Sequence, residues 1–232
     1  MEFILTDEGA IPCECRNQKI IERNIKSSMV DKSFLSATFE NYKPLPHNRE
    51  MLEVAKKYAL YFSEITKQPT NGLMFAAKVG ETRVNKAKNA ELKTRHNSYG
   101  LGKTHLLSAV ANMLLPQGVQ VVLVNDTDIV AELRQGQFDD DTGYFESLIQ
   151  KLEGAELLIW DDLGKAKTTD WVLNQYYRIF NNRYRNRLPV CISTNEDIDT
   201  LSERIGGAAA SRLYAMCKPR LVLCEGPDYR LR

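Results

Sequence analysis

Short apolar runs alternate with longer stretches of helical spacing along most of this chain. The apolar runs are bounded by polar and turn-forming residues, and their length suits buried strands better than helices. The candidate strands are residues 72–77, 119–124, 156–160, 189–194 and 220–224. Between them, apolar residues recur every three or four positions, which is the spacing of a helix with one buried face.

The candidate helices are residues 51–65, 103–115, 127–134, 143–153, 170–187 and 199–217. In the first of them, Leu52, Ala55, Leu60 and Phe62 are available for a core-facing side. Strands that alternate with helices predict an α/β fold, in which a mostly parallel five-stranded sheet is the middle of three layers.

The composition fits one folded unit. The 232 residues are 43% hydrophobic and 26% charged, which is enough for one α/β core. We expect residues 1–45 to form a short N-terminal arm and linker, and residues 46–232 to form the folded domain. No apolar stretch approaches the roughly 20 residues of a membrane span, and residues 1–12 lack the layout of a signal peptide. A cytoplasmic protein without membrane contact is therefore expected.

A glycine-rich turn before a candidate helix carries the clearest chemical signal. Gly100 and Gly102 allow backbone N–H groups to face phosphate oxygens, Lys103 can reach the β- and γ-phosphates, and Thr104 can place its hydroxyl on Mg²⁺. The full pattern has a glycine where Asn97 stands, and asparagine tolerates left-handed backbone better than most residues. This segment predicts ATP and Mg²⁺ as ligands.

Two acids at the end of a candidate strand support the same prediction. Asp161 and Asp162 follow the apolar run 156–160 directly, and open α/β sheets bind ligands at the carboxyl ends of their strands. In P-loop ATPases the first such acid helps to hold Mg²⁺ and the second orients or activates the attacking water. Because the second acid here is aspartate, one methylene shorter than glutamate, slow hydrolysis is expected.

The connection between the first sheet strand and the glycine-rich turn is unusually long. Residues 81–98 are polar, rich in lysine and arginine, and without apolar periodicity, whereas such connections are normally short. We interpret this segment as an insertion that leaves Gly80 on its near side, and we expect a mobile surface excursion. His96, Asn97 and Ser98 also match the downstream junction of inteins; an ordinary surface insertion and a misread gene boundary are the alternatives.

A net charge of +1 gives no global basic field, so a contact with nucleic acid has to come from a local patch. Residues 178–187 are the candidate, because arginines alternate there with Phe180 and Tyr184. Such a segment fits phosphate contacts and base stacking on single-stranded DNA. It equally fits a solvated helix end whose cations complement the helix dipole. Tyr176 and Tyr177 are expected to pack this helix on the sheet.

Four segments in this order resemble the DnaC/DnaI-type helicase loaders and their IstB-like relatives. They are residues 39–42 (FENY), 100–106 (GLGKTHL), 161–164 (DDLG) and 189–195 (PVCISTN). The resemblance covers roughly residues 30 to 232 and implies an AAA+ ATPase core. It also implies that the protein binds the replicative DNA helicase and helps to place it on single-stranded DNA.

The resemblance also assigns roles to single residues. Asn195 matches the polar sensor of the γ-phosphate or the attacking water, although it also fits a helix N-cap or turn. Arg212 matches the arginine finger that acts on a neighbouring subunit, with Arg204 as a rival, and this role implies self-assembly. Arg230 matches the second sensor arginine, which contacts the nucleotide of its own subunit.

The cysteines predict neither disulfides nor a metal site. Five cysteines, an odd number, argue against a disulfide framework. Cys13 and Cys15 resemble half of a zinc module that many of these loaders carry, but a closed zinc site needs four ligands. We therefore predict no zinc in this chain as given. Cys191, Cys217 and Cys224 have apolar neighbours and are expected in the core.

Three functions remain open from the sequence. The first is an ATP-dependent loader of a hexameric helicase, with residues 13–45 as the expected helicase contact. The second is an IstB-like accessory ATPase of transposition, which has the same core. The third is a non-hydrolysing, nucleotide-dependent scaffold, because the insertion interrupts the phosphate-binding loop.

Overall fold

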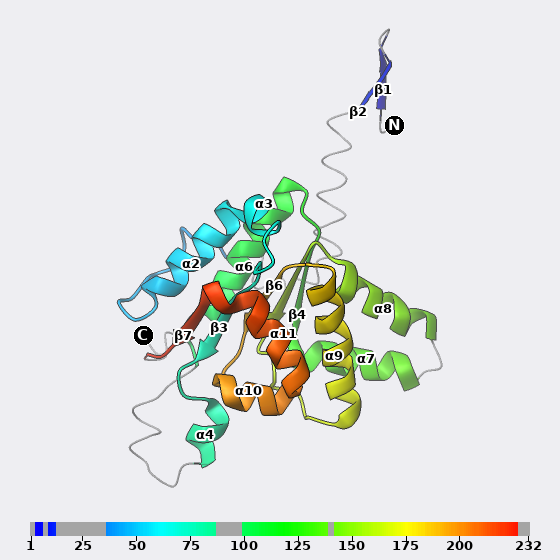
Figure 1. Cartoon of the computed structure of the whole chain (residues 1–232). Helices are drawn as coiled ribbons and strands as arrows, with labels where there is room; N and C mark the ends of the chain where they lie inside the picture. Colours follow the sequence, from blue (N-terminus) through cyan, green and yellow to red (C-terminus); the bar gives the residue numbers. More distant parts are fainter. Residues whose placement is uncertain (1–2, 7–8, 13–35, 87–98, 139–141, 227–232) are drawn as a thin grey trace.

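The computed structural model describes residues 3–6, 9–12, 36–86, 99–138 and 142–226. A five-stranded sheet in the order β4-β5-β6-β3-β7 forms its centre (Figure 1). Every pairing between these strands is parallel, so the predicted sheet is confirmed. The strands are β3 (Leu73–Ala77), β4 (Val121–Asn125), β5 (Leu157–Asp161), β6 (Val190–Ser193) and β7 (Leu221–Cys224). A separate antiparallel hairpin pairs β1 (Phe3–Thr6) with β2 (Gly9–Pro12).

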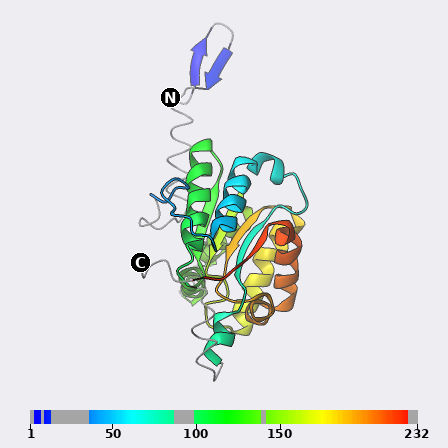
Figure 2. The same cartoon turned by 90° about the vertical axis from the view of Figure 1, so that its left-hand side faces the viewer.

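Helices cover both faces of the sheet, which gives the three layers visible in Figure 2. One face is covered by α2 (Arg49–Leu60), α3 (Phe62–Ile65) and α6 (Lys103–Leu114). The other is covered by α7 (Asp126–Phe138), α8 (Thr142–Gly154), α9 (Asp170–Arg185), α10 (Ile198–Ile205) and α11 (Gly207–Cys217). Short 3-10 turns follow α6 at Leu115–Gln117 and α11 at Lys218–Arg220. No described helix is both long and apolar enough to cross a bilayer.

The strands are almost entirely apolar because both faces of the sheet are covered, although Leu223 of the edge strand β7 is 50% exposed. In β3, Met74 and Ala76 belong to the core on the α9 side, whereas Leu73 and Phe75 belong to the core on the α6 side. In β5, Trp160 packs edge-on against Tyr176 of α9, with ring centroids 5.8 Å apart. The two cores therefore lie on opposite faces of one sheet.

Two segments that we predicted as single helices are interrupted. Residues 51–65 divide into α2 and α3 at Tyr61, whose φ of −104° and ψ of 23° are not helical. Residues 199–217 divide into α10 and α11 at Gly206, whose φ is 86°. Glycine reaches this left-handed region without the steric cost that a Cβ imposes, so the chain turns there and both helices keep an apolar face on the sheet.

The inserted segment begins differently from our expectation. Its first residues form a short helix, α4 (Glu81–Lys86), instead of a mobile excursion. The backbone N–H of Gly80 donates to Asp197 at 2.9 Å, and that of Thr82 donates to Glu196 at 3.1 Å. These hydrogen bonds fix the start of α4 to the segment after β6. Residues 87–98 lie outside the described part of the chain.

Candidate nucleotide-binding site

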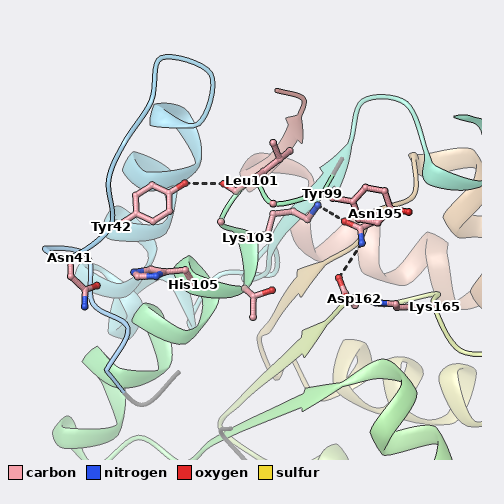
Figure 3. A pocket seen from close by; sticks show the side chains of 12 residues that line it. Asn41, Tyr42, Tyr99, Leu101, Lys103, His105, Asp162, Lys165 and Asn195 are labelled. Carbon is pink, nitrogen blue, oxygen red and sulfur yellow. Dashed lines mark hydrogen bonds and ion pairs between the residues drawn. The ribbon is translucent and has the colours of Figure 1, made fainter. Parts of the chain in front are cut away.

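A cavity of about 380 Å³ opens at the carboxyl edge of the parallel sheet (Figure 3). It lies between the N-terminus of α6, the end of β5 and the end of β6. Its lining residues are Asn41, Tyr42, Tyr99, Gly100, Leu101, Gly102, Lys103, Thr104, His105, Asp162, Lys165 and Asn195. This is the position at which open α/β sheets bind their ligands.

The glycine-rich turn has the conformation that its sequence predicts. Gly100 and Gly102 have φ values of 58° and 84°, in the left-handed region. A Cβ on Gly102 would lie only 2.6 Å from the Tyr42 ring, whose hydroxyl donates to the Leu101 carbonyl at 3.0 Å. The turn therefore presents its backbone to the cavity directly before α6, and the N-terminus of a helix favours anions.

Lys103 is a buried cation at the wall of the cavity. Its side chain donates to Asn195 Oδ1 at 2.7 Å, and the residue is only 5% exposed. Burial lowers the pKa of this lysine, and the carboxylates of Asp162 and Asp161 oppose that shift. A partly desolvated ammonium gains stability from an anionic ligand, so the setting of Lys103 suits a phosphate.

Asp161 is held by two hydroxyl groups. Thr104 Oγ1 lies 2.9 Å and 3.1 Å from the two carboxylate oxygens, and Ser193 Oγ donates to Oδ1. Burial and the neighbouring Asp162 raise the pKa of Asp161, whereas the hydrogen bonds from Ser193 and Thr104 lower it. The Thr104 and Asp161 oxygens are hard ligands that fit Mg²⁺ when phosphate oxygens complete the shell.

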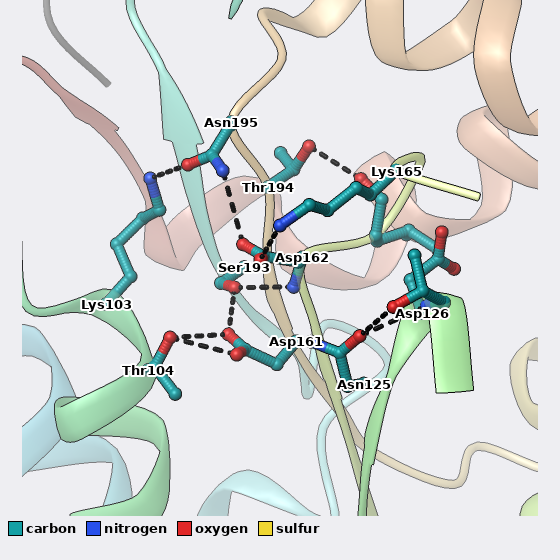
Figure 4. A network of polar contacts seen from close by, with 12 residues as sticks. Lys103, Thr104, Asn125, Asp126, Asp161, Asp162, Lys165, Ser193, Thr194 and Asn195 are labelled. Atoms are coloured by element: carbon teal, nitrogen blue, oxygen red, sulfur yellow. Dashed lines mark hydrogen bonds and ion pairs between the residues drawn. The ribbon is translucent and has the colours of Figure 1, made fainter. Parts of the chain in front are cut away.

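Asp162 is at the centre of a second set of contacts (Figure 4). Asn195 Nδ2 lies 3.3 Å from Asp162 Oδ1, and Lys165 Nζ lies 3.1 Å from Oδ2. The backbone N–H of Asp162 donates to Ser193 Oγ at 3.0 Å. With the Lys103–Asn195 bond, these contacts form a continuous polar chain across the cavity.

Several residues of the site were not predicted from the sequence. Ser193 is part of an apolar strand, Lys165 belongs to a polar loop, and neither has a motif of its own. At the other end of the cavity, the Tyr42 and His105 rings are 5.3 Å apart, and His105 Nε2 is 2.9 Å from the Thr38 carbonyl. Tyr42 and His105 entered the sequence analysis only as part of the resemblance. This aromatic end fits a planar group such as a base.

Of the three predicted arginines, Arg212 and Arg204 are described by the structure, and neither is among the described residues that line this cavity. Arg212 on α11 donates to Asn181 Oδ1 at 2.7 Å, and its guanidinium lies 4.9 Å from the centre of the Tyr177 ring. Arg204 lines a smaller neighbouring cavity of about 80 Å³ and donates to Thr82 Oγ1 at 3.1 Å. Arg230 lies outside the described residues.

The candidate DNA segment 178–187 is only partly exposed. Arg183 is fully buried and donates to the carbonyls of Leu152, Ala155 and Pro189 at 2.7–2.9 Å. Its burial lowers the arginine pKa to about 9. A surface role is therefore wrong for Arg183, which instead joins α8, α9 and β6.

Residues within this segment and directly before it also differ in exposure. Arg178 is paired with Glu146 and Glu153. Tyr176 is buried as expected, but Tyr177 is 42% exposed, so its predicted packing on the sheet is wrong.

The chain has a P-loop core of the AAA+ class. This class is defined here by the sheet order, the glycine-rich turn before α6, the acids after β5 and the asparagine after β6. The chain belongs to the family of IstB-like ATP binding proteins, whose model matches residues 83–224. That match covers more than half of the chain. It confirms the resemblance recognised in the sequence.

Curated relatives are similar over different lengths. The chain is 27% identical to the phage-like element PBSX protein XkdC of Bacillus subtilis (strain 168), over 94% of this chain and 76% of XkdC. It is 27% identical to the uncharacterized protein YqaM of the same strain, of which it spans 64%. It is 26% identical to the replicative helicase loader DnaC of Escherichia coli (strain K12), over 49% of this chain and 46% of DnaC.

Solved structures support the same fold. The DnaC helicase loader superposes with a TM-score of 0.63 at 20% identity, over 84% of this chain and 99% of that chain. The replication initiator DnaA bound to AMPPCP and single-stranded DNA superposes with a TM-score of 0.62 at 18% identity, over 86% of this chain and 52% of that chain. At these identities the likeness establishes the fold.

Proposed function

We propose that this chain is an ATP-hydrolysing helicase loader, which binds a replicative DNA helicase and helps to place it on single-stranded DNA. One observation carries the ATPase part of the proposal. Lys103, Thr104, Asp162 and Asn195 come from three separate segments and line one cavity, and Asp161 contacts Thr104 at its edge. The glycine cradle, the buried ammonium and the hard oxygen ligands fit a nucleoside triphosphate together with Mg²⁺.

Each residue has a separate role in the proposed reaction. Lys103 and the backbone of Gly100 and Gly102 bind the phosphates. Asp162 orients the attacking water by accepting its hydrogen bond, or takes a proton from it. Asn195 orients that water or the terminal phosphate. These roles use groups that already face the cavity.

Thr104 and Asp161 would hold Mg²⁺. When bound, this ion neutralises charge on the phosphates and so favours attack by a nucleophile. Ser193 keeps the Asp161 carboxylate oriented through its hydrogen bond.

The DNA-replication part of the proposal rests on relatives. DnaC of Escherichia coli is a replicative helicase loader, and the solved DnaC and DnaI structures have the same fold over 99% and 95% of their chains. XkdC, which is similar over almost the whole of this chain, belongs to a phage-like element. We infer that a helicase and single-stranded DNA are the partners, that residues 13–45 contact the helicase, and that the protein acts in the cytoplasm.

A second candidate is an accessory ATPase of transposition. It is favoured by the family model itself, which describes IstB-like ATP binding proteins and matches residues 83–224. Both candidates require the same nucleotide site, and they differ in the protein that the nucleotide-bound form engages.

Two measurements test the ATPase part and the DNA-replication part of the proposal: a nucleotide titration, and the rate of hydrolysis with and without the proposed partners. The chain should bind a fluorescent ATP analogue in the presence of Mg²⁺, and Lys103→Ala should abolish this binding. The control Lys67→Ala, at an exposed position just after α3 that does not line the cavity, should leave it unchanged. Addition of the replicative helicase and single-stranded DNA should change the rate of ATP hydrolysis. Unchanged binding in Lys103→Ala would refute the nucleotide site. Hydrolysis that responds to a transposase but not to the helicase would favour the second candidate.

A further inference from the structure

Lys165 is a second lysine at the proposed nucleotide site, and no motif assigns it a role. It follows β5 by a few residues and lines both the main cavity and the smaller neighbouring one. Its Nζ lies 3.1 Å from Asp162 Oδ2, and its side chain is 52% exposed. Figure 4 shows this side chain extending toward the same group of residues that Lys103 reaches from the opposite side.

The backbone that carries Lys165 is fixed by a tight turn. Asp162 and Gly164 have φ values of 55° and 87°, and the backbone N–H of Lys165 donates to the Asp162 carbonyl at 3.2 Å. The next residue, Ala166, donates its N–H to the buried carboxylate of Asp126 at 2.8 Å. The turn therefore returns the chain toward the cavity and holds the Cα of Lys165 at its rim.

Asp126 anchors this turn from inside the core. Its carboxylate is fully buried and also accepts hydrogen bonds from Trp160 Nε1 and from the Tyr176 hydroxyl, each at 2.8 Å. Three donors satisfy one buried carboxylate, so the loop has little freedom to shift. Mobility at this position is therefore confined to the half-exposed Lys165 side chain.

The two lysines differ in how firmly they are held. Lys103 is buried and bonded to Asn195, whereas the ammonium of Lys165 forms an ion pair whose cationic side is open to solvent. Exposed ion pairs contribute little to stability. A phosphate accepts the same kind of charge-assisted hydrogen bond as a carboxylate. An arriving phosphate can therefore compete with Asp162 for Lys165 at small cost.

We propose that Lys165 is a nucleotide-contacting residue that exchanges Asp162 for the terminal phosphate of a bound nucleoside triphosphate. The inference rests on the proposed ATP-binding function and adds a determinant of triphosphate over diphosphate binding. A diphosphate leaves Lys165 on Asp162. A triphosphate binds the ammonium instead. The carboxylate of Asp162 then keeps its hydrogen bond from Asn195 and has one oxygen available to accept from water.

The proposed exchange of Asp162 for phosphate is tested by measuring the affinity of four proteins for two nucleotides. The proteins are the unaltered chain, Lys165→Ala, Lys165→Arg and the control Lys167→Ala, whose residue is exposed on the same loop and does not line the cavity. The ligands are ADP and a non-hydrolysable ATP analogue, each with Mg²⁺, and the measurement is the dissociation constant by titration calorimetry. Melting temperatures without nucleotide check that each variant is folded.

Lys165→Ala should weaken binding of the ATP analogue about tenfold to a hundredfold, the range for one hydrogen bond between charged groups. Its affinity for ADP should stay within about twofold of the unaltered chain, since no terminal phosphate is present to engage the ammonium. Lys165→Arg should retain most of the preference for the ATP analogue, and Lys167→Ala should match the unaltered chain.

The outcomes distinguish this inference from the function on which it rests. If the unaltered chain binds both ligands and Lys165→Ala binds both equally well, or loses both by the same factor, the exchange of partners is refuted while the nucleotide site stands. If the unaltered chain binds neither ligand, the proposed function fails and the inference fails with it.

Discussion

Asp161 and Asp162 are adjacent in sequence, yet their side chains have different surroundings. Asp161 is 5% exposed and is enclosed by the hydroxyls of Thr104 and Ser193. The Asp162 side chain is 21% exposed and faces the cavity with Asn195 and Lys165 as partners. Because consecutive residues of a strand point to opposite faces, and Asp162 leaves the strand with a φ of 55°, one acid suits a metal and the other suits water.

Substitution of each acid should separate binding from turnover. Asp162→Asn removes the carboxylate that faces the cavity but keeps the phosphate contacts, so ATP affinity should hold and the turnover number should fall by about 10² to 10⁴, the usual contribution of a positioned base. Asp161→Asn should instead raise the Mg²⁺ concentration needed for half-maximal binding. Titration of Mg²⁺ against nucleotide binding, with steady-state hydrolysis, measures both.

The reverse result would contradict these assignments. Loss of Mg²⁺ dependence in Asp162→Asn, with normal turnover in Asp161→Asn, would exchange the roles of the two acids. A Ser193→Ala variant keeps both carboxylates, but it removes one hydrogen bond from the Asp161 carboxylate and the acceptor of the Asp162 backbone N–H.

Arg183 shows how burial reverses an interpretation based on residue type. Its guanidinium satisfies carbonyl groups at the end of α8 and before β6, and the residue has no exposed surface. We expect Arg183→Ala to destabilise the fold by about 3–5 kcal/mol, because buried acceptors lose their donors. Arg185→Ala, two positions away and exposed, should change stability by no more than about 0.5 kcal/mol.

Urea unfolding followed by circular dichroism measures this difference. A stable Arg183→Ala variant with reduced affinity for single-stranded DNA would restore the original interpretation of the segment. Equal effects of the two substitutions on stability would also contradict the structural role given to Arg183.

The sequence predicted the site residues that stand in contiguous motifs and missed those that are assembled by folding. Lys103, Thr104 and Asp161 belong to short sequence motifs that indicate their chemistry, and the structure brings them together as expected. Ser193 and Lys165 acquire a function only from residues more distant in sequence or from the turn geometry after β5. Their types, serine and lysine, are too common to indicate a site by themselves.

At the scale of elements, the short helix α4 connects the inserted segment to the region that follows β6. Asp197 holds this junction. It accepts from the N–H of Thr200 at 3.0 Å as the N-cap of α10, accepts from the N–H of Gly80, and pairs with Arg83 at 3.2 Å. The backbone N–H of Glu81 in α4 donates to the carbonyl of Asn195 at 2.9 Å, so the insertion is joined directly to the residue that we propose as the sensor.

Removal of the Asp197 carboxylate should weaken this junction. Asp197→Ala loses a helix cap and a buried acceptor, so we expect destabilisation by about 1–3 kcal/mol. Asp199→Ala is the matched control: it also pairs with Arg83, but its side chain is 77% exposed, and exposed pairs are worth less than about 1 kcal/mol. Urea unfolding of the two variants measures the difference.

The same junction predicts a dependence on pH. Burial raises the pKa of Asp197. Hydrogen bonds from the backbone of Thr200 and Gly80 and the charge of Arg83 lower it by more than burial raises it, so the pKa is lower than usual. A lowered pKa in the folded state stabilises the protein above the unfolded value of 3.8, and this contribution is lost as the pH falls below it. Asp197→Ala should therefore lose less stability than the unaltered chain between about pH 5 and pH 2.

Helix boundaries were harder to predict than strands. The strand runs are apolar on both faces and bounded by polar residues, and each predicted run overlaps an observed strand. The apolar spacing continues on both sides of Gly206, so the periodicity predicted a single helix where the structure has two. The α4 helix has no buried residue, and polar contacts with the segment after β6, which include Glu196 and Asp197, account for it.

At the scale of the whole molecule, the parallel sheet collects residues from segments that are far apart in sequence. The ends of β5 and β6 and the start of α6 meet at one edge, and that edge carries the described groups proposed to bind the phosphates and Mg²⁺. Arg212 lies elsewhere. It lies on α11 against α9, where it contacts Asn181 and Tyr177, and it does not line the cavity of its own chain.

If Arg212 contributes to hydrolysis, it therefore has to reach a neighbouring subunit. Arg212→Ala should leave ATP binding nearly unchanged and reduce hydrolysis on the order of 10³-fold or more, since a finger arginine stabilises transition-state charge. Mixing Arg212→Ala with Lys103→Ala should restore part of the activity, because the first variant supplies an intact cavity and the second supplies the arginine. Each variant alone is the control, and the activity of the unaltered chain should rise more than linearly with its concentration. Hydrolysis that is proportional to concentration and insensitive to Arg212→Ala would rule out a shared site and favour an ATPase that acts as a single chain.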